Sequence, residues 1–197
     1  MPGTKVPGTM TQLINMGRPK RNLDPSGMYH IIARGNNKLP IFHCVEDYRM
    51  YLFILLQAKF AYGFSMYHYV LMPNHVHLLM QPRREKFSAC MHKIQTNYAK
   101  YFCKKYNFVG HVWQDRFKSL SIETNAYLLA CGNYIEMNPV RAGLGTRPEE
   151  WAWSSCKFYV FGEKNKLISC NPLYETFAKE ESERRLLYSQ QLSKTRS

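Results

Sequence analysis

Two histidines flank a single valine within residues 71–79 (LMPNHVHLL), directly after a Pro-Asn turn. Side chains alternate between the two faces of a β-strand, so His75 and His77 share one face while Val76 and Leu78 share the other. The two imidazoles are then about 7 Å apart along the strand, at about 3.3 Å per residue. The segment therefore predicts a strand that packs one face on a core and presents two histidines able to converge on one metal ion.

The segments around this strand alternate between strand and helix patterns. Four of them have the pattern of strands, namely residues 27–34, 64–72, 75–80 and 116–123. Helical spacing of apolar residues predicts helices over residues 46–61, 87–106 and 124–137, with a terminal helix around 174–192. The two-residue Pro-Asn loop makes the second and third strands a hairpin in which Met72 pairs with His75 and Val70 with His77. This order predicts an α+β fold with helices packed on an antiparallel sheet.

Tyr134 and Asn138 are four residues apart at the end of the third predicted helix, so they lie one turn apart on one face. A tyrosine hydroxyl can act as a covalent nucleophile, and an amide oxygen is a hard ligand suited to Mg or Mn. If this face meets the histidine pair, the site has three metal ligands and a nucleophile. Two other interpretations stay open. Tyr127 lies two turns earlier on nearly the same face, and Asn138, before Pro139, could instead cap a following short helix.

Two further histidines are secondary candidates near this site. The hairpin register places His68 opposite Leu79, on the histidine face but farther from the pair, where it would support a ligand or contact DNA. His30 in the first strand is another histidine of this kind. Glu136 is two positions from Tyr134, so we expect it to point away and do not assign it as a base.

The chain has 197 residues with a formal net charge of +13 and 14% aromatic residues, a combination that favours a polyanionic partner. Unpaired bases stack on aromatic rings while Lys and Arg contact the phosphates, so single-stranded nucleic acid fits this composition. The candidate DNA contacts are Arg18, Arg21, Arg34, Arg83, Arg84, Lys93, Lys100, Lys104, Arg116 and Arg141. The three lysines share one helix face, which is either a solvated face or a path for phosphates.

The length and the 45% hydrophobic content favour one core domain with extensions. We expect a flexible basic arm over residues 1–24, a core domain over 25–162 and a polar, helical extension over 163–197. No apolar run is long enough to span a bilayer, and the first residues lack the apolar core of a signal peptide. These features predict a cytoplasmic protein without a membrane partner.

Five motifs follow one another along the chain: RGNN with PIF over residues 34–42, MPNHVHLL over 72–79, GHVWQDRF over 110–117, YIEMNPVRAG over 134–143, and WAWSS over 151–155. In this order they resemble the single-tyrosine HUH transposases, which include insertion-sequence and REP-associated tyrosine transposases. The histidine pair corresponds to the family's motif of histidine, bulky apolar residue and histidine. The resemblance covers residues 16–162.

The resemblance implies a ferredoxin-like HUH endonuclease architecture and an enzyme that cleaves and rejoins single-stranded or hairpin DNA. Carried over by position, Tyr134 is the nucleophile, and His75, His77 and Asn138 bind Mg or Mn. Attack by the tyrosine forms a 5′-phosphotyrosine and releases a 3′-hydroxyl, which later reseals the DNA. The alternative is a noncatalytic nucleic-acid-binding protein on the same scaffold. Whether the protein is a monomer or a homodimer stays open.

Overall fold

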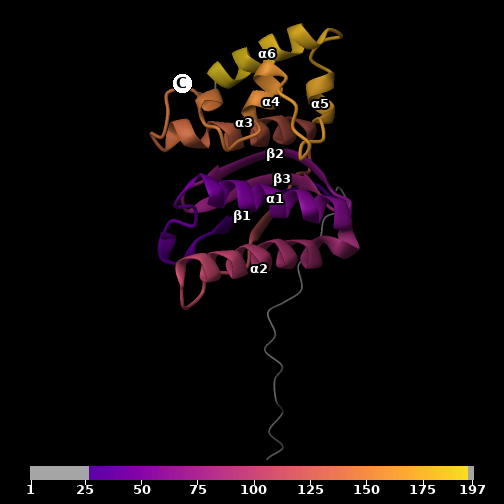
Figure 1. Ribbon diagram of the computed structural model, residues 1–197. Helices are drawn as coiled ribbons and strands as arrows, with labels where there is room; N and C mark the ends of the chain where they lie inside the picture. Colours follow the sequence, from indigo (N-terminus) through magenta and orange to yellow (C-terminus); the bar gives the residue numbers. More distant parts are fainter. Residues whose placement is uncertain (1–26, 195–197) are drawn as a thin grey trace, which may run out of the picture.

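A four-stranded antiparallel sheet forms the centre of the molecule, with helices on both of its sides (Figure 1). The structure, a computed structural model, describes residues 27–194. The strands are β1 (Tyr29–Arg34), β2 (Ser65–Met72), β3 (His75–Gln81) and β4 (Lys118–Ser121). They lie in the order β2-β3-β1-β4, and every neighbouring pair is antiparallel. The predicted α+β class is therefore confirmed.

Helices α1 and α2 lie on one side of the sheet, and α3 to α6 lie on the other (Figure 1). Their bounds are α1 (Val45–Tyr62), α2 (Phe87–Tyr106), α3 (Asn125–Arg141), α4 (Cys156–Phe161), α5 (Pro172–Glu175) and α6 (Glu181–Lys194). Short 3-10 turns occupy Asn36–Lys38, Arg84–Lys86 and Pro148–Glu150. The terminal helix predicted over residues 174–192 is thus two helices, α5 and α6.

The hairpin register follows the sequence pattern. Met72 pairs with His75 and Val70 with His77, as the two-residue loop requires. Alternation then sends Val76 and Leu78 into the core shared with α1 and α2, and both are fully buried. The histidines point to the opposite side of the sheet, where α3 packs.

Helix α3 covers only part of its side of the sheet. It contacts β2 and β3, and a small apolar core that includes Val70, Leu79 and Ile135 fills the space between them. Over β1 and β4 the same side is partly open, because Leu120 is 48% exposed and Arg34 is exposed too. This uncovered strip beside α3 is called the open face below.

Gly35 ties the loop after β1 to the turn that precedes His75. Its N–H donates to the Asn74 carbonyl oxygen at 2.8 Å. A side-chain Cβ here would lie 2.4 Å from the Leu39 carbonyl oxygen, so any residue larger than glycine would push the loop away. The glycine therefore holds the loop at the base of the histidine strand.

The chain after residue 162 packs into the same apolar core as the sheet, through Tyr174, Tyr188 and Leu192. The domain boundaries over residues 25–162 and 163–197 stay predictions. The arm expected over residues 1–24, with Arg18 and Arg21, lies outside the described residues. Of the helices in residues 27–194, none has the length and apolar character needed to cross a bilayer.

Candidate active site

Strand β3 places His75 and His77 on one face, with ring centroids 5.0 Å apart. Their cross-strand neighbours on β1 are Arg34 and Ile32. His77 is buried and His75 is half-buried. The pair therefore lies at the border between α3 and the open face, as the alternation of the strand predicts.

Hydrogen bonds fix which ring nitrogen of each histidine is free. The Asn74 Nδ2 donates to the Lys38 carbonyl oxygen, so its Oδ1 faces His75 and accepts from Nδ1 at 2.6 Å. The Nδ1 of His77 lies 2.8 Å from Nε2 of His30. If His77 offers its Nε2 to a metal, its Nδ1–H must donate to His30, which then carries its own proton on Nδ1.

Burial keeps these imidazoles neutral. It lowers the pKa of His30 to about 4 and, with help from the nearby Arg34, that of His75 to about 4. The pKa of His77 falls to about 2, mainly through burial and then through His30, His75 and Arg34. Neutral imidazole is the form that ligates metals, so the pair is ready to bind a cation at neutral pH.

In EDTA, we expect the free energy of unfolding to fall as the pH is lowered from 6.5 towards 4. In that range the unfolded chain binds a proton on His30 that the folded protein excludes. The shift in its pKa corresponds to roughly 3 kcal/mol, at 1.36 kcal/mol per unit. Urea unfolding at pH 7 and pH 4.5 measures the loss, which should be about 2 kcal/mol smaller in His30→Gln. An equal loss in both proteins would contradict this assignment.

Helix α3 brings Tyr134 over the histidines. Its ring meets His77 edge-on at a centroid distance of 5.9 Å and His30 at 6.0 Å. The guanidinium carbon of Arg141 lies 4.9 Å from the centre of the same ring. Tyr134 is 42% exposed, so an incoming strand can reach it. The arrangement joins an exposed phenol, two unprotonated imidazoles and a cation.

Asn138 lies one turn after Tyr134 inside α3, and its interpretation as a cap of a following helix is wrong. The helix continues through Pro139 to Arg141. Pro139 has no N–H for the Ile135 carbonyl, and the Nδ2 of Asn138 donates to that oxygen at 3.3 Å and to the Tyr134 carbonyl at 2.8 Å. The carboxamide nitrogen of Asn138 thus replaces the hydrogen bond that Pro139 cannot donate, which explains why the helix does not end at Met137.

Two imidazole nitrogens and one amide oxygen are donors that a divalent ion can use, and of these only the amide oxygen is a typical ligand of a hard ion such as Mg. Each histidine has its Nδ1 engaged and its Nε2 available, and no hydrogen bond within the described chain uses Oδ1 of Asn138. In residues 27–194 no group of three or more His, Cys, Asp or Glu side chains converges as a metal site. Asn138 lies one turn from Tyr134 on α3, and its hydrogen bonds are to carbonyl oxygens of its own helix.

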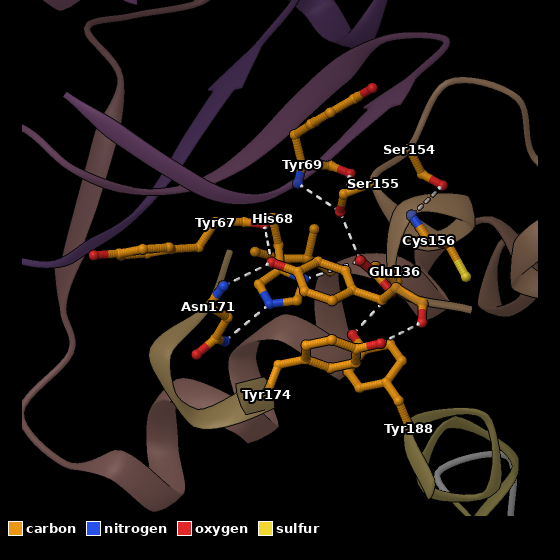
Figure 2. Close-up of polar contacts among 12 residues, drawn as sticks. Tyr67, His68, Tyr69, Glu136, Ser154, Ser155, Cys156, Asn171, Tyr174 and Tyr188 are labelled. Atoms are coloured by element: carbon orange, nitrogen blue, oxygen red, sulfur yellow. Dashed lines mark hydrogen bonds and ion pairs between the residues drawn. The ribbon is translucent and has the colours of Figure 1, made fainter. Parts of the chain in front are cut away.

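A buried polar cluster holds α3 against the rest of the molecule (Figure 2). The carboxylate of Glu136, fully buried, accepts hydrogen bonds from His68 Nδ1 at 2.9 Å, Ser155 Oγ at 2.6 Å and Tyr188 OH at 2.9 Å. Asn171 Nδ2 donates to the other nitrogen of His68 at 3.0 Å. Glu136 points away from Tyr134, as expected. The suggestion that His68 contacts DNA is wrong, because it is 1% exposed within this cluster.

The candidate DNA contacts separate into three groups. Arg34 and Arg116 line a polar depression of about 380 Å³ on the open face, here called the basic hollow, together with Lys118, which was not among the predicted contacts, and the acidic Asp115. Arg141 lies over Tyr134. The remaining described residues are distant: Arg83 and Arg84 follow the far end of β3, and Lys93, Lys100 and Lys104 are exposed on α2, across the sheet. Their roles in DNA binding stay predictions.

His30 is the member of the site that sequence reasoning ranked too low. The only signal was its position in a strand of alternating pattern, which does not say which strand lies beside it. Pairing of β1 with β3 brings its ring to 5.0 Å from that of His77.

The chain is similar to known transposases. A family model described as "Transposase IS200 like" matches residues 25–138, a segment that contains the histidine pair, Tyr134 and Asn138. A solved REP-associated tyrosine transposase bound to a REP hairpin aligns with a TM-score of 0.62 and 20% identity, over 79% of this chain and 93% of the other. A solved candidate transposase from Deinococcus radiodurans R1 aligns with a TM-score of 0.41 and 15% identity, over 63% of this chain and 89% of the other. No curated protein matches.

Proposed function

The chain belongs to the family of IS200-like transposases, and from this premise we propose that it cleaves and rejoins single-stranded DNA through a covalent bond to Tyr134. The observation that carries the proposal is the edge-on contact between Tyr134 and His77, at a centroid distance of 5.9 Å. It puts an exposed phenol beside the two neutral imidazoles. Both residues belong to the same chain, so this contact needs no second protomer.

In the proposed reaction, the phenolic oxygen of Tyr134 attacks the phosphorus of a phosphodiester. The new bond joins this oxygen to phosphorus while the bond from phosphorus to the 3′-oxygen breaks. The phenolic proton ends, in the overall balance, on the departing 3′-hydroxyl. Arg141 favours the attack because its positive charge lies beside the ring that gains negative character. A later attack by a 3′-hydroxyl reverses these bond changes and frees the tyrosine.

His75, His77 and Asn138 would hold the divalent ion, Mg or Mn, through two imidazole nitrogens and one amide oxygen. When bound, such an ion polarises a phosphate oxygen and stabilises charge at the reacting phosphate. The neutral ligands leave the charge of the ion undiminished. Asn74 orients the His75 ring by accepting a hydrogen bond from its Nδ1, and His30 orients the His77 ring through the hydrogen bond between His30 Nε2 and His77 Nδ1.

The proposed substrate is single-stranded or hairpin DNA. A strand can approach Tyr134 along the open face, where Arg34, Arg116 and Lys118 supply positive charge. The similar solved transposase is bound to a REP hairpin, which supports a hairpin as the first substrate to test. In duplex DNA the faces of the bases are covered by their neighbours, so they cannot stack on the exposed rings of α3.

The test uses hairpin DNA with single-stranded flanks, labelled at either end, incubated with the protein and Mn²⁺. We expect the 3′-labelled strand to run with the protein on a denaturing gel, because the 5′-phosphate of that fragment bonds to tyrosine. The 5′-labelled strand should be shortened and carry a 3′-hydroxyl that a polymerase extends. DNA binding without any adduct would instead support the noncatalytic alternative.

A metal-binding measurement tests the ligand set without relying on catalysis. We expect His77→Ala to weaken Mn²⁺ binding at least about 10-fold in titration calorimetry, because one of three protein ligands is lost. His92→Ala is the matched control, since His92 is exposed on α2 across the sheet. Equal Mn²⁺ affinity in both variants would show that the histidine pair does not bind the metal.

A further inference from the structure

A second depression opens beside Tyr134, between α3 and the open face. His30, Ile32 and Leu120 line it from the sheet, and Tyr127, Ala130 and Tyr134 line it from α3. Its volume is about 340 Å³, many times the roughly 30 Å³ that one water occupies in the liquid. It is called the aromatic hollow below, because two tyrosine rings form one of its walls.

Large apolar side chains are exposed at this place. Leu120 is 48% exposed, Tyr127 is 43% and Tyr134 is 42%. Exposed apolar surface that gathers at one point of a protein marks a binding site. Tyr127 and Tyr134 are seven residues apart on α3, so they line the hollow two turns from each other on the same helical face.

Positive charge lies on both sides of this apolar surface. Ile32 is shared with the basic hollow, whose Arg34, Arg116 and Lys118 follow on the sheet side. Arg141 lies over Tyr134 on the helix side. An apolar, aromatic depression between cations matches one nucleotide unit of a single strand, in which a flat base lies between two phosphates.

We propose that the aromatic hollow binds one unpaired nucleobase of the DNA strand that Tyr134 attacks, with Tyr127 as the side chain on which the base stacks. This inference rests on the proposed function and adds to it a specificity site. The hollow shares Tyr134 with the reacting centre, so its base belongs to a nucleotide next to the scissile phosphate. A base paired in a duplex cannot enter, since its faces are already covered by its neighbours.

The role explains the second tyrosine on the helix face. Tyr127 is separated from the histidine pair, as the aromatic contacts to His30 and His77 are made by Tyr134. No hydrogen bond among residues 27–194 engages the Tyr127 hydroxyl. A half-exposed ring fixed on a long helix has little freedom to lose on binding, which favours stacking.

The experiment measures binding, so it does not depend on cleavage. Hairpin DNA with single-stranded flanks is made with one abasic position at a time and titrated against Tyr134→Phe protein, which retains the ring but has no nucleophile. At one flank position, loss of the base should weaken binding about 10-fold, the usual size for one stacked base. Adding Tyr127→Ala to this protein should abolish the difference in affinity between intact and abasic DNA, and adding Tyr127→Phe should retain it. Phe60→Ala, which removes a 75%-exposed aromatic residue of α1, is the matched control.

Photocrosslinking gives an independent reading of the position. DNA with 5-iododeoxyuridine at the sensitive position should crosslink to Tyr127. An abasic penalty that persists in Tyr127→Ala, or a crosslink to another residue, would overturn the proposal. If the wild-type protein formed no covalent adduct, only the proposed cleavage activity would be refuted. The binding series with abasic DNA would still test whether the aromatic hollow binds a base. Absence of all single-strand binding would overturn both.

Discussion

Tyr134→Phe should form no detectable covalent DNA adduct, a loss of at least about 1,000-fold relative to the wild-type protein. The substitution removes a single oxygen atom, the one that attacks phosphorus in the proposed reaction. It keeps the ring that contacts His30, His77 and Arg141, so the fold and the histidine geometry should remain. Adduct formation with 3′-labelled hairpin DNA and Mn²⁺, followed on a denaturing gel, measures the effect.

Tyr127→Phe is the sharpest comparison for this variant. Both tyrosines lie on the same face of α3 and are exposed to a similar degree, so general damage to the helix would affect both variants alike. We expect Tyr127→Phe to form the adduct still. The opposite pattern, with an adduct in Tyr134→Phe and none in Tyr127→Phe, would transfer the role of nucleophile to Tyr127.

The parts of the site that depend on local geometry could be predicted from the sequence. A strand has a period of two and the Pro-Asn loop has two residues, so the common face of His75 and His77 and their pairing with Met72 and Val70 follow directly. A helix places residues four apart on one face, which relates Tyr134 to Asn138. Both inferences use only neighbours along the chain.

The parts that depend on sheet order could not be predicted. β1 is separated from β3 by a helix and a strand, and nothing in either segment says that they pair. The bond between His30 and His77, and the joining of Lys118 to Arg34 in the basic hollow, are consequences of the order β2-β3-β1-β4. Long-range pairing also decides that Lys93 lies on the side away from the histidines.

The end of α3 shows a different limit, set by side-chain compensation. Proline disfavours helix for the residue before it and removes one hydrogen bond, so a prediction that stops at Met137 follows the general rule. Asn138 overrides the rule by donating to the Ile135 carbonyl that Pro139 leaves free. The amide group of Asn138 thereby allows Asn138 and Arg141 to lie on the same helix as Tyr134.

The second large effect is expected at Glu136, where we predict that replacement by alanine lowers the free energy of unfolding by about 3 kcal/mol or more. The change would leave two buried donors, on His68 and Tyr188, without an acceptor, while Ser155 Oγ could still donate to the Tyr69 carbonyl oxygen at 3.3 Å (Figure 2). Each unsatisfied buried group costs about 1–3 kcal/mol, and the lost side chain also leaves a cavity. Urea unfolding at neutral pH measures the change.

Two further variants separate this cluster from the general effect of removing a carboxylate. Glu136→Gln should cost less than Glu136→Ala, because its amide oxygen can still accept and its NH₂ can donate to the Tyr188 hydroxyl. Glu163→Ala removes an exposed carboxylate and should change stability by no more than about 0.5 kcal/mol. Glu136 lies midway between Tyr134 and Asn138 and joins α3 to β2, to the residue before α4 and to α6. Its loss should therefore also slow adduct formation in the protein that remains folded. A Glu136→Ala protein as stable as Glu163→Ala would mean that packing of α3, and not this cluster, holds Tyr134 over the histidines.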